Sequence, residues 1–450
     1  MCSKTWQRNA GFVQIVIAER DFQELLNPAY FRGARNLSKL RMTTEIIKTD
    51  VCIIGAGPAG ATTSLFLSKM GIPHLIVDAA TFPRDKVCGD GLDLKVVRVL
   101  RHLDPAIVEH EFIENRIFMP CWGTRFFTQN GRATDFVYDP RPGTTLPHPL
   151  FWTAKRLHFD DFLIKKLDAR FADFRQNTKI EQIERDGKGW RLKAGLNNEL
   201  EIRTLLLIGA DGDHSVLLRH LGERKIDRRH YAGTLRQYWR GVANMHPKNL
   251  IEVYFPPRLP MSYFYIFPLP GGEANVGYGM VSEVASKGGH NLRDIFKQLI
   301  HEDPVMSPRF QKATPLEEPV GWGIPLASRR RRAFGDGYLL VGDAASLVCP
   351  TSGEGIGTGM ISGYIAAHFA QKALKNKCFD AEEFKNYDRE IYRRLNDEIR
   401  LYNLMMAVSP RIYDFGLNVL APNPLFQWSF HRRVGGWLNT AYKVPLGVRV

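Results

Sequence analysis

The sequence contains no uninterrupted apolar run of about 20 residues, the length that a membrane-spanning helix requires. Its N-terminus lacks the apolar core and the cleavage site of a secretory signal peptide. The six cysteines are widely separated and form no CxxC pair, which argues against a disulfide framework. These absences predict a reduced cytoplasmic protein, with any membrane contact peripheral and at the cytoplasmic face.

Several catalytic signatures are absent as well. No HExxH segment, Ser-His-Asp order or Walker A segment occurs, so metal-dependent proteolysis, serine hydrolysis and phosphoryl transfer have no support. There is no zinc pattern, no low-complexity tract and no repeat of solenoid period. The 450 residues, 44% hydrophobic and 24% charged, indicate a globular α/β protein of two joined domains.

The net charge of +14 is compatible with nucleic acid, an anionic membrane or anionic cofactors. Apart from Arg329-Arg330-Arg331-Arg332, the positive charge is scattered, and no RNA-binding aromatic signature accompanies it. We therefore expect no nucleic-acid partner.

A short buried strand at 51–54 runs directly into Gly55-Ala56-Gly57-Pro58-Ala59-Gly60, which opens a helix. In this context Gly55 permits the tight turn, Gly57 lets the backbone approach a pyrophosphate, and Gly60 lets helix and strand pack closely. A second strand ends at Asp78, at the spacing where a carboxylate accepts hydrogen bonds from ribose hydroxyls. The unit predicts a dinucleotide site, without separating FAD from NAD.

Two later segments favour a flavin. A buried strand ends at Gly342-Asp343, where the carboxylate can bind polyol hydroxyls. The following stretch opens an apolar helix, whose positive end would stabilise negative charge on a reduced flavin ring. The residues of that stretch expected at the cofactor are Pro350, Gly353, Gly355 and Ile356.

From about residue 44 to 374 the sequence resembles the flavoproteins that include p-hydroxybenzoate hydroxylase, and within them the geranylgeranyl reductase family. The resemblance implies that Asp343 binds the flavin ribityl chain and that the 350–357 loop lies against the isoalloxazine ring. It also implies that Asp211, in Ala210-Asp211-Gly212, helps to organise the pyrophosphate region. Asp211 could instead be a helix N-cap, since Asp before a helical run is common.

Three stretches carry the likeness to the reductases. The segment 83–91 is similar to an Arg-x-Lys-x-Cys-Gly motif expected beside the flavin. Its implied cofactor residues are Arg84, Lys86, Cys88 and Gly89. Arg156, followed by Phe159-Asp160, resembles an Arg-x-x-Phe-Asp motif, which implies a cofactor contact, although Arg156 could simply pair with Asp160 at i,i+4.

The third stretch, 263–268 followed by Ala274-Asn275-Val276-Gly277, is similar to the family's aromatic segment facing the substrate cavity, with Tyr265 where Trp is common. Tyr263 and Tyr265 are candidate catalytic residues, although alternating aromatics in a strand also form plain core. Cys88, near the cation Lys86, is a candidate proton donor or redox thiol, although most cysteines are inert packing residues.

The predicted fold class is α/β, with a Rossmann-like FAD-binding domain interleaved with a β-rich substrate domain and followed by a C-terminal helical region. Residues 1–41 are expected to be a disordered extension, with Met42 the better start. The predicted segments are 42–115, 205–234 and 330–378 for FAD, 116–204 and 235–329 for the substrate domain, and 379–450 for the helical region.

The leading hypothesis is an FAD-dependent oxidoreductase that reduces carbon-carbon double bonds of a prenyl chain by hydride transfer from reduced flavin. The alternatives are a monooxygenase or halogenase of the same fold, or a scaffold with structural FAD. No second GxGxxG unit occurs, so the electron donor is NAD(P)H binding transiently or another reductant. The expected substrate is a hydrophobic small molecule, and the aromatic and basic residues at 425–438 either touch a membrane or cap the substrate cavity.

Overall fold

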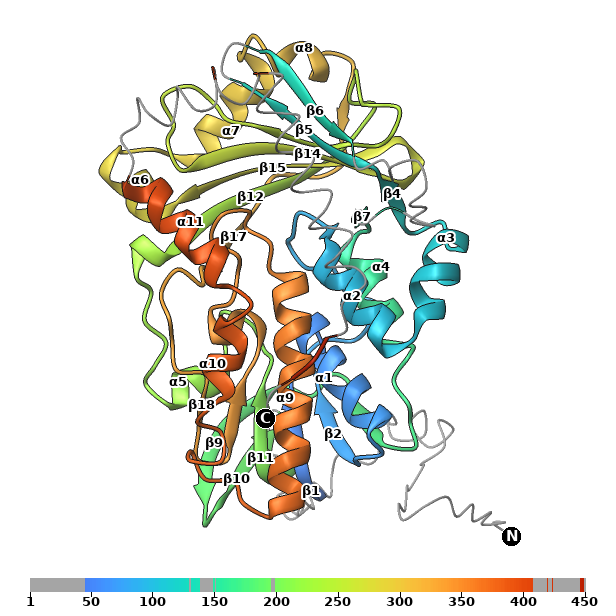
Figure 1. The fold of residues 1–450 in the computed structure, drawn as a ribbon, viewed down its shortest axis with the longest axis vertical. Coiled ribbons are helices and arrows are strands. Elements are labelled where there is room, and N and C mark those ends of the chain that lie inside the picture. Colours follow the sequence, from blue (N-terminus) through green and yellow to red (C-terminus); the bar gives the residue numbers. More distant parts are fainter. Residues whose placement is uncertain are drawn as a thin grey trace, which may run out of the picture. The chain divides into compact units, whose positions relative to one another are not determined.

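A mostly parallel sheet organises the larger part of the chain (Figure 1). The computed structural model describes residues 45–128, 131–137, 149, 151–195, 199–407, 419, 423 and 446–448. The predicted extension at 1–41 and the segment 425–438 lie outside the described residues. From Glu45 onward the chain forms one unit, and the account below concerns that unit.

The first sheet is built around β1 (Glu45–Ile54), whose run Val51-Cys52-Ile53-Ile54 is fully buried, as an apolar strand covered on both faces requires. β1 pairs in parallel with β2 (His74–Val77) on one side and with β11 (Leu200–Gly209) on the other. Beyond these lie β8 (Ala172–Arg175), β19 (Tyr338–Leu340) and β18 (Phe334–Gly335), while β9 (Ile180–Asp186) and β10 (Gly189–Ala194) extend β11 as an antiparallel hairpin.

Two helices, α1 (Pro58–Lys69) and α9 (Ile356–Asn376), pack on this sheet and on each other (Figure 1). Their close approach depends on Gly363, because a Cβ there would lie 2.3 Å from the carbonyl oxygen of Ala59. The contact brings the N-terminal ends of both helices to the carboxyl edge of the strands. Ligands of open α/β sheets bind at that edge.

A second, largely antiparallel sheet lies beyond this edge (Figure 1). Its strands, in spatial order, are β16 (Thr314–Pro315), β12 (Tyr231–Arg240), β15 (Glu273–Val281), β14 (Ser262–Leu269), β13 (Ile251–Tyr254), β5 (Gly123–Phe127) and β6 (Ala133–Val137), with β17 (Val320–Pro325) paired to β12. The helices α6 (Ser282–Lys287), α7 (Leu292–His301) and α8 (Ser307–Phe310) follow β15.

The two faces of β14 have different neighbours because side chains alternate along a strand. Phe264 and Ile266 belong to the hydrophobic cluster that includes Phe296 of α7. Tyr263 and Tyr265 point to the opposite side, where they line a cavity. One strand therefore contributes both a core face and a site face.

Shorter elements connect the sheets. A small sheet contains β3 (Gly91–Leu92), β7 (Phe151–Thr153) and β4 (Met119–Cys121). The remaining helices are α2 (Leu94–Leu103), η5 (Ile107–Glu111), α3 (Phe112–Glu114), α4 (Arg156–Ile164), α5 (Val216–His220), η6 (Arg228–His230), η7 (Pro270–Gly272), η8 (Gly342–Ala345), α10 (Tyr387–Tyr392) and α11 (Asn396–Ala407).

The predicted α/β fold class is confirmed, but the sheets divide the chain differently from the predicted segments. The stretch 116–204 was expected in the substrate domain, yet β8, β9, β10 and the start of β11 extend the first sheet. After α4 the chain returns to the first sheet, where β8 pairs in parallel with β2. The sequence did not show this because short strands have the same pattern of apolar and polar residues in either sheet. The predicted helical region at 379–450 contains the helices α10 and α11 in its described part.

Candidate active site

A cavity of about 750 Å³ is lined by residues of both sheets. All of the predicted site residues line it except Gly60 and Pro350. Gly60 packs against the turn below, since a Cβ there would lie 1.9 Å from the carbonyl oxygen of Gly55. Pro350 is buried in the turn at the start of the 350–357 loop. Sequence segments as far apart as Ile54 and Gly359 therefore meet at one site.

The glycine turn is held in the conformation that the sequence predicts. Gly55 has φ of +98°, which a residue with a side chain rarely adopts. Asp78 supports the turn, because one of its carboxylate oxygens accepts a hydrogen bond of 2.7 Å from the backbone N–H of Ala56. The other accepts one of 2.8 Å from the N–H of Ala80. Asp78 thus shapes the site as well as lining it.

Beside Gly57 the N-terminus of α1 faces the cavity without a side-chain cap, so its backbone N–H groups are available to an anion. A Cβ at Gly57 would lie 3.6 Å from the nearest nitrogen of Arg84 and 3.9 Å from that of Arg156. Gly57 thus leaves a cradle bordered by two guanidinium groups. The charge and dimensions of this cradle fit the pyrophosphate of a dinucleotide.

Arg156 pairs with Asp160 at i,i+4 and also lines the cavity, so the structure is compatible with both roles that the sequence left open. Its Nε and Nη2 atoms donate to Asp160 at 2.6 and 2.7 Å, and the same side chain lines the cavity. Asp160 also accepts from Arg84 at 3.0 Å. The fully buried carboxylate therefore fixes both guanidinium groups at the cradle, and this indirect role of Asp160 was not predicted.

Two acids offer free oxygens to a ligand. The N-cap of α5 is Ser215 and not Asp211, although Asp211 Oδ2 accepts a hydrogen bond of 2.7 Å from the N–H of Val216. The buried Oδ1 of Asp211 has no hydrogen-bond partner among the described residues. Asp343 accepts no side-chain hydrogen bond among the described residues, and burial raises the pKa of its carboxyl while Lys86 and Arg156 lower it. An unpartnered buried acceptor is costly, so hydroxyl donors such as those of FAD suit both positions.

The N-terminus of α9 differs from the expectation. Glu354, which the sequence analysis did not single out, accepts a hydrogen bond from the N–H of Gly357 and partly satisfies this helix end. Glu354 also pairs with Lys95 at 3.4 Å, and burial raises its pKa to about 7. The helix end facing the cavity therefore carries a carboxyl group that is about half ionised at neutral pH.

Lys86 and Cys88 both reach the cavity. Burial lowers the pKa of Lys86 to about 8, and its Nζ lies 3.3 Å from the ring centroid of Trp322 on β17, a cavity residue that was not predicted. Burial raises the pKa of the Cys88 thiol, with Arg156 acting in the opposite direction. The expected activation of Cys88 by a neighbouring cation is outweighed by burial, and its thiol stays protonated at neutral pH.

The wall opposite the cradle is apolar and aromatic. Tyr265 and Tyr263 are joined there by Phe126, Val253 and Phe255, which the sequence analysis did not identify. The Tyr263 hydroxyl donates to the carbonyl oxygen of Ser352 at 2.6 Å. The Tyr265 hydroxyl has no hydrogen-bond partner among the described residues, and burial raises its pKa well above the usual value. Tyr265 therefore presents an O–H group to whatever occupies the cavity.

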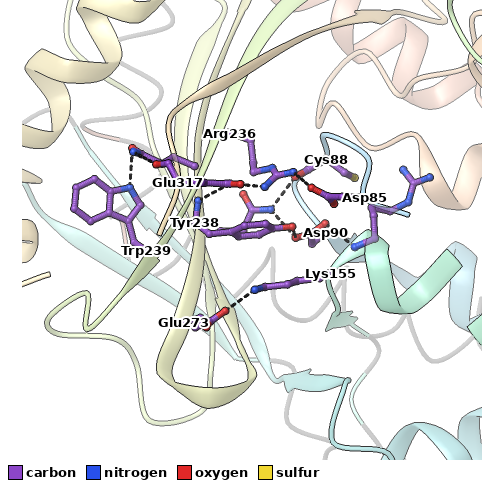
Figure 2. A network of polar contacts seen from close by, with 12 residues as sticks. Asp85, Cys88, Asp90, Lys155, Arg236, Tyr238, Trp239, Glu273 and Glu317 are labelled. Carbon is purple, nitrogen blue, oxygen red and sulfur yellow. Dashed lines mark hydrogen bonds and ion pairs between the residues drawn. The ribbon is translucent and has the colours of Figure 1, made fainter. Parts of the chain in front are cut away.

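Figure 2 shows a buried polar network that joins the segment 83–91 to the second sheet. At its centre Asp90, which is fully buried, accepts from the Tyr238 hydroxyl at 2.7 Å and from the Asn275 amide at 2.8 Å. Its second oxygen accepts from the backbone N–H of Arg156 at 3.2 Å. Asn275 also donates to the carbonyl oxygen of Cys88 at 2.7 Å. Asp90 thus fixes the backbone of Arg156, and Asn275 that of Cys88, relative to the second sheet.

A second pair of contacts reinforces this junction. Arg236, with 2% of its surface exposed, donates to Asp85 at 2.7 Å and to Glu317, and its guanidinium lies 4.0 Å from the ring centroid of Tyr238. Lys155 lies on the other side, 4.5 Å from the same ring, and pairs with Glu273 at 2.6 Å. Apart from Asp85, which lies in the segment 83–91, no motif marked these residues, because they come from several separate sequence segments.

The Asp90 network predicts a specific pH dependence of stability. Burial raises the pKa of Asp90 to about 6 in the folded chain from an ordinary value of 3.8. Its stabilising contribution is therefore greatest below pH 4 and is lost as pH rises through 6, for a total of about 3 kcal/mol. We expect Asp90→Asn to remove this change, so that the free energies of unfolding of the two proteins converge or cross between pH 4 and 7.

Urea denaturation at half-unit pH steps would measure the difference. Asp186→Asn, in the β9–β10 hairpin, is the matched control. Its free energy of unfolding should change with pH in the same way as that of the unchanged protein. Parallel curves for Asp90→Asn as well would contradict the assigned ionisation of Asp90.

Comparison with known proteins agrees with this geometry. The family model described as FAD binding domain matches residues 48–378. A digeranylgeranylglycerophospholipid reductase of Methanocaldococcus jannaschii is 29% identical over 381 residues, covering 83% of this chain and 89% of the relative. A menaquinone reductase of Mycolicibacterium smegmatis is 29% identical over 332 residues, covering 71% and 76%.

Solved structures show the same fold. A geranylgeranyl bacteriochlorophyll reductase-like protein of Thermoplasma acidophilum superposes with a TM-score of 0.71 at 20% identity, covering 88% of this chain and 100% of that one. A flavin-dependent brominase superposes with a TM-score of 0.68 at 19% identity, covering 86% and 94%. The chain therefore belongs to the FAD binding domain family, as an FAD-dependent oxidoreductase related to the geranylgeranyl reductases.

Proposed function

We propose that this protein reduces carbon-carbon double bonds of a prenyl chain. The observation that carries the proposal is that one cavity is lined both by the cradle at Gly57 and by an apolar, aromatic wall. The names of two relatives indicate reductases of a digeranylgeranyl lipid and of menaquinone, and both of those substrates carry prenyl chains. FAD, when bound and reduced, supplies the hydride equivalent for such a reaction.

The residues of this chain have separate roles in the proposal. Arg84, Arg156 and the N-terminus of α1 hold the pyrophosphate, while Asp343 binds the polyol chain. The wall formed by Phe126, Val253 and Phe255 excludes water from the apolar substrate. A saturated product also needs a proton, and the unpartnered Tyr265 hydroxyl is its proposed source, with the Cys88 thiol as the second candidate.

The reductant and the location belong to the same proposal. NAD(P)H or another reductant approaches the flavin transiently, since the sequence has no second dinucleotide unit. No helix in the described part of the chain has the length and apolarity to cross a membrane. We place the protein in the cytoplasm, with any contact to membrane lipid peripheral and at the cytoplasmic face.

Anaerobic single-turnover measurements test the proposal. The FAD-loaded protein is reduced with dithionite or NADPH and mixed with geranylgeranyl diphosphate or a prenylated quinone, and flavin absorbance and product mass are followed. We expect flavin reoxidation without oxygen and a gain of two hydrogens for each reduced bond. If the flavin stays reduced with every prenyl substrate until oxygen is admitted, and the substrate then gains oxygen, the protein is a monooxygenase.

That second function has its own support. The fold match to a flavin-dependent brominase supports a halogenase or monooxygenase as the alternative, because one fold can serve several reactions. The sequence nevertheless lacks the halogenase Trp-x-Trp-x-Ile-Pro pattern at 263–268, where it has Tyr-Phe-Tyr-Ile-Phe-Pro. Reduction is therefore the function that the site supports best.

A further inference from the structure

A second cleft, of about 430 Å³, lies between α10 and the connection from β17 to β18, and it shares no lining residue with the FAD cavity. We name it the arginine cleft. Its lining residues are Arg330, Arg331, Arg332, Asp388, Arg389, Tyr392, Arg393 and Asn396. Five guanidinium groups thus surround a hollow that contains one carboxylate.

The nearby acids offset only part of this charge. Arg331 faces Glu223, with 3.8 Å between charged atoms, and Arg393 faces Glu390 at 3.1 Å. Arg332 and Arg389 have no acidic partner within 4.0 Å among the described residues. The carboxyl group of Asp388 accepts a hydrogen bond from the N–H of Ala333, and burial raises its pKa. The segment 408–450, most of which lies outside the described residues, has one acidic residue, Asp414, in its sequence.

The surrounding contacts hold the arginines without neutralising them. Arg330 donates to the side-chain oxygen of Asn396 at 2.6 Å and lies 5.5 Å from the ring centroid of Tyr392. Arg332 lies 4.6 Å from the ring centroid of Phe334. Burial and repulsion from Arg329 lower the pKa of Arg331. Like charges gathered in this way repel one another, and an anion bound between them removes the penalty.

We propose that the arginine cleft binds a phosphate group of a ligand other than FAD. The planar guanidinium fork matches the oxygens of phosphate with paired hydrogen bonds, and several forks on two chain segments suit a phosphate ester or a diphosphate. Such a group can belong to a soluble compound or to a phospholipid head group. The assignment is independent of the reaction proposed for the FAD cavity.

Charge reversal tests the assignment in the FAD-loaded protein, in which the cofactor already fills the other phosphate site. The test variant is Arg332→Glu/Arg389→Glu. The matched control is Lys297→Glu/Lys312→Glu, which changes the net charge equally at two exposed positions on the far side of the second sheet. Calorimetry with inorganic pyrophosphate forms one arm, and sedimentation with phosphatidylglycerol vesicles, against phosphatidylcholine vesicles, forms the other.

We expect the test variant to lose at least tenfold in affinity while the control stays within twofold of the unchanged protein. If the test variant loses affinity for pyrophosphate, the ligand of the cleft is a soluble phosphate compound. If it loses affinity for the vesicles alone, the ligand is a lipid head group. Absence of binding by the unchanged protein in both arms, or equal binding by test and control variants, overturns the proposal. If the double variant does not retain FAD absorbance, Arg389→Gln, at an exposed position, replaces it. The expected loss of affinity for pyrophosphate or vesicles is then about threefold.

Discussion

Gly57→Ala is expected to weaken FAD binding about a hundredfold, equivalent to about 2.7 kcal/mol, while the protein without FAD keeps its stability. The backbone at Gly57 has φ of −67° and ψ of −178°, which alanine adopts freely. The added methyl group would meet no atom closer than 3.6 Å in the ligand-free chain. It would instead occupy the cradle into which the pyrophosphate must approach.

Gly60→Ala is the matched comparison, three residues along the same turn. There the methyl group would lie 1.9 Å from the Gly55 carbonyl oxygen and 3.1 Å from the Cβ of Ala210. Backbone must move, so we expect a loss of about 1–3 kcal/mol in the free energy of unfolding even without cofactor. Fluorescence titration of FAD and thermal unfolding of the apoprotein separate the two effects. Equal loss of apoprotein stability in both variants would contradict the cradle at Gly57.

The contrast between these glycines shows how much of the site local sequence specifies. The strand, turn, helix and acid from Val51 to Asp78 lie in one continuous stretch, and the hydrophobic pattern fixes their order in space. Asp343 and Asp211 were predictable for a related reason, since each follows a buried strand of the same parallel sheet. Residues at the carboxyl ends of parallel strands converge whatever their separation in sequence.

Apart from Glu354 at the start of α9 and Asp160 on α4, the residues that escaped prediction lie on the second sheet or pack between the two sheets. Phe126 on β5 and Val253 on β13 line the cavity only because those two strands pair in parallel, a long-range register that the local pattern does not encode. Asp90 stands within the segment 83–91 that was noticed, yet its partners Tyr238 and Asn275 come from β12 and β15. A buried carboxylate between three segments is a tertiary feature with no sequence period.

Tyr265→Phe is expected to slow anaerobic flavin reoxidation by prenyl substrate by about 10²- to 10⁴-fold, the range for loss of a positioned proton donor. The Tyr265 hydroxyl has no partner among the described residues and faces the cavity, so its removal leaves no buried group unsatisfied. Gly277 lies opposite it on β15, and a Cβ at that position would lie 2.2 Å from the hydroxyl oxygen. The absence of a side chain at Gly277 therefore leaves the space that the Tyr265 ring occupies.

Tyr263→Phe and Cys88→Ser complete the test. Tyr263 hydrogen-bonds the carbonyl of Ser352, so its loss should weaken flavin binding a few-fold through the 350–357 loop and leave single-turnover reduction within about tenfold. Cys88→Ser should also stay within about tenfold, because its protonated thiol is not the proposed donor. Stopped-flow absorbance of the three FAD-loaded variants would measure the rates. If flavin reoxidation is slow in Cys88→Ser and fast in Tyr265→Phe, Cys88 is the proton donor. The hydrogen bond from Asn275 to the Cys88 carbonyl oxygen would then position the reacting thiol.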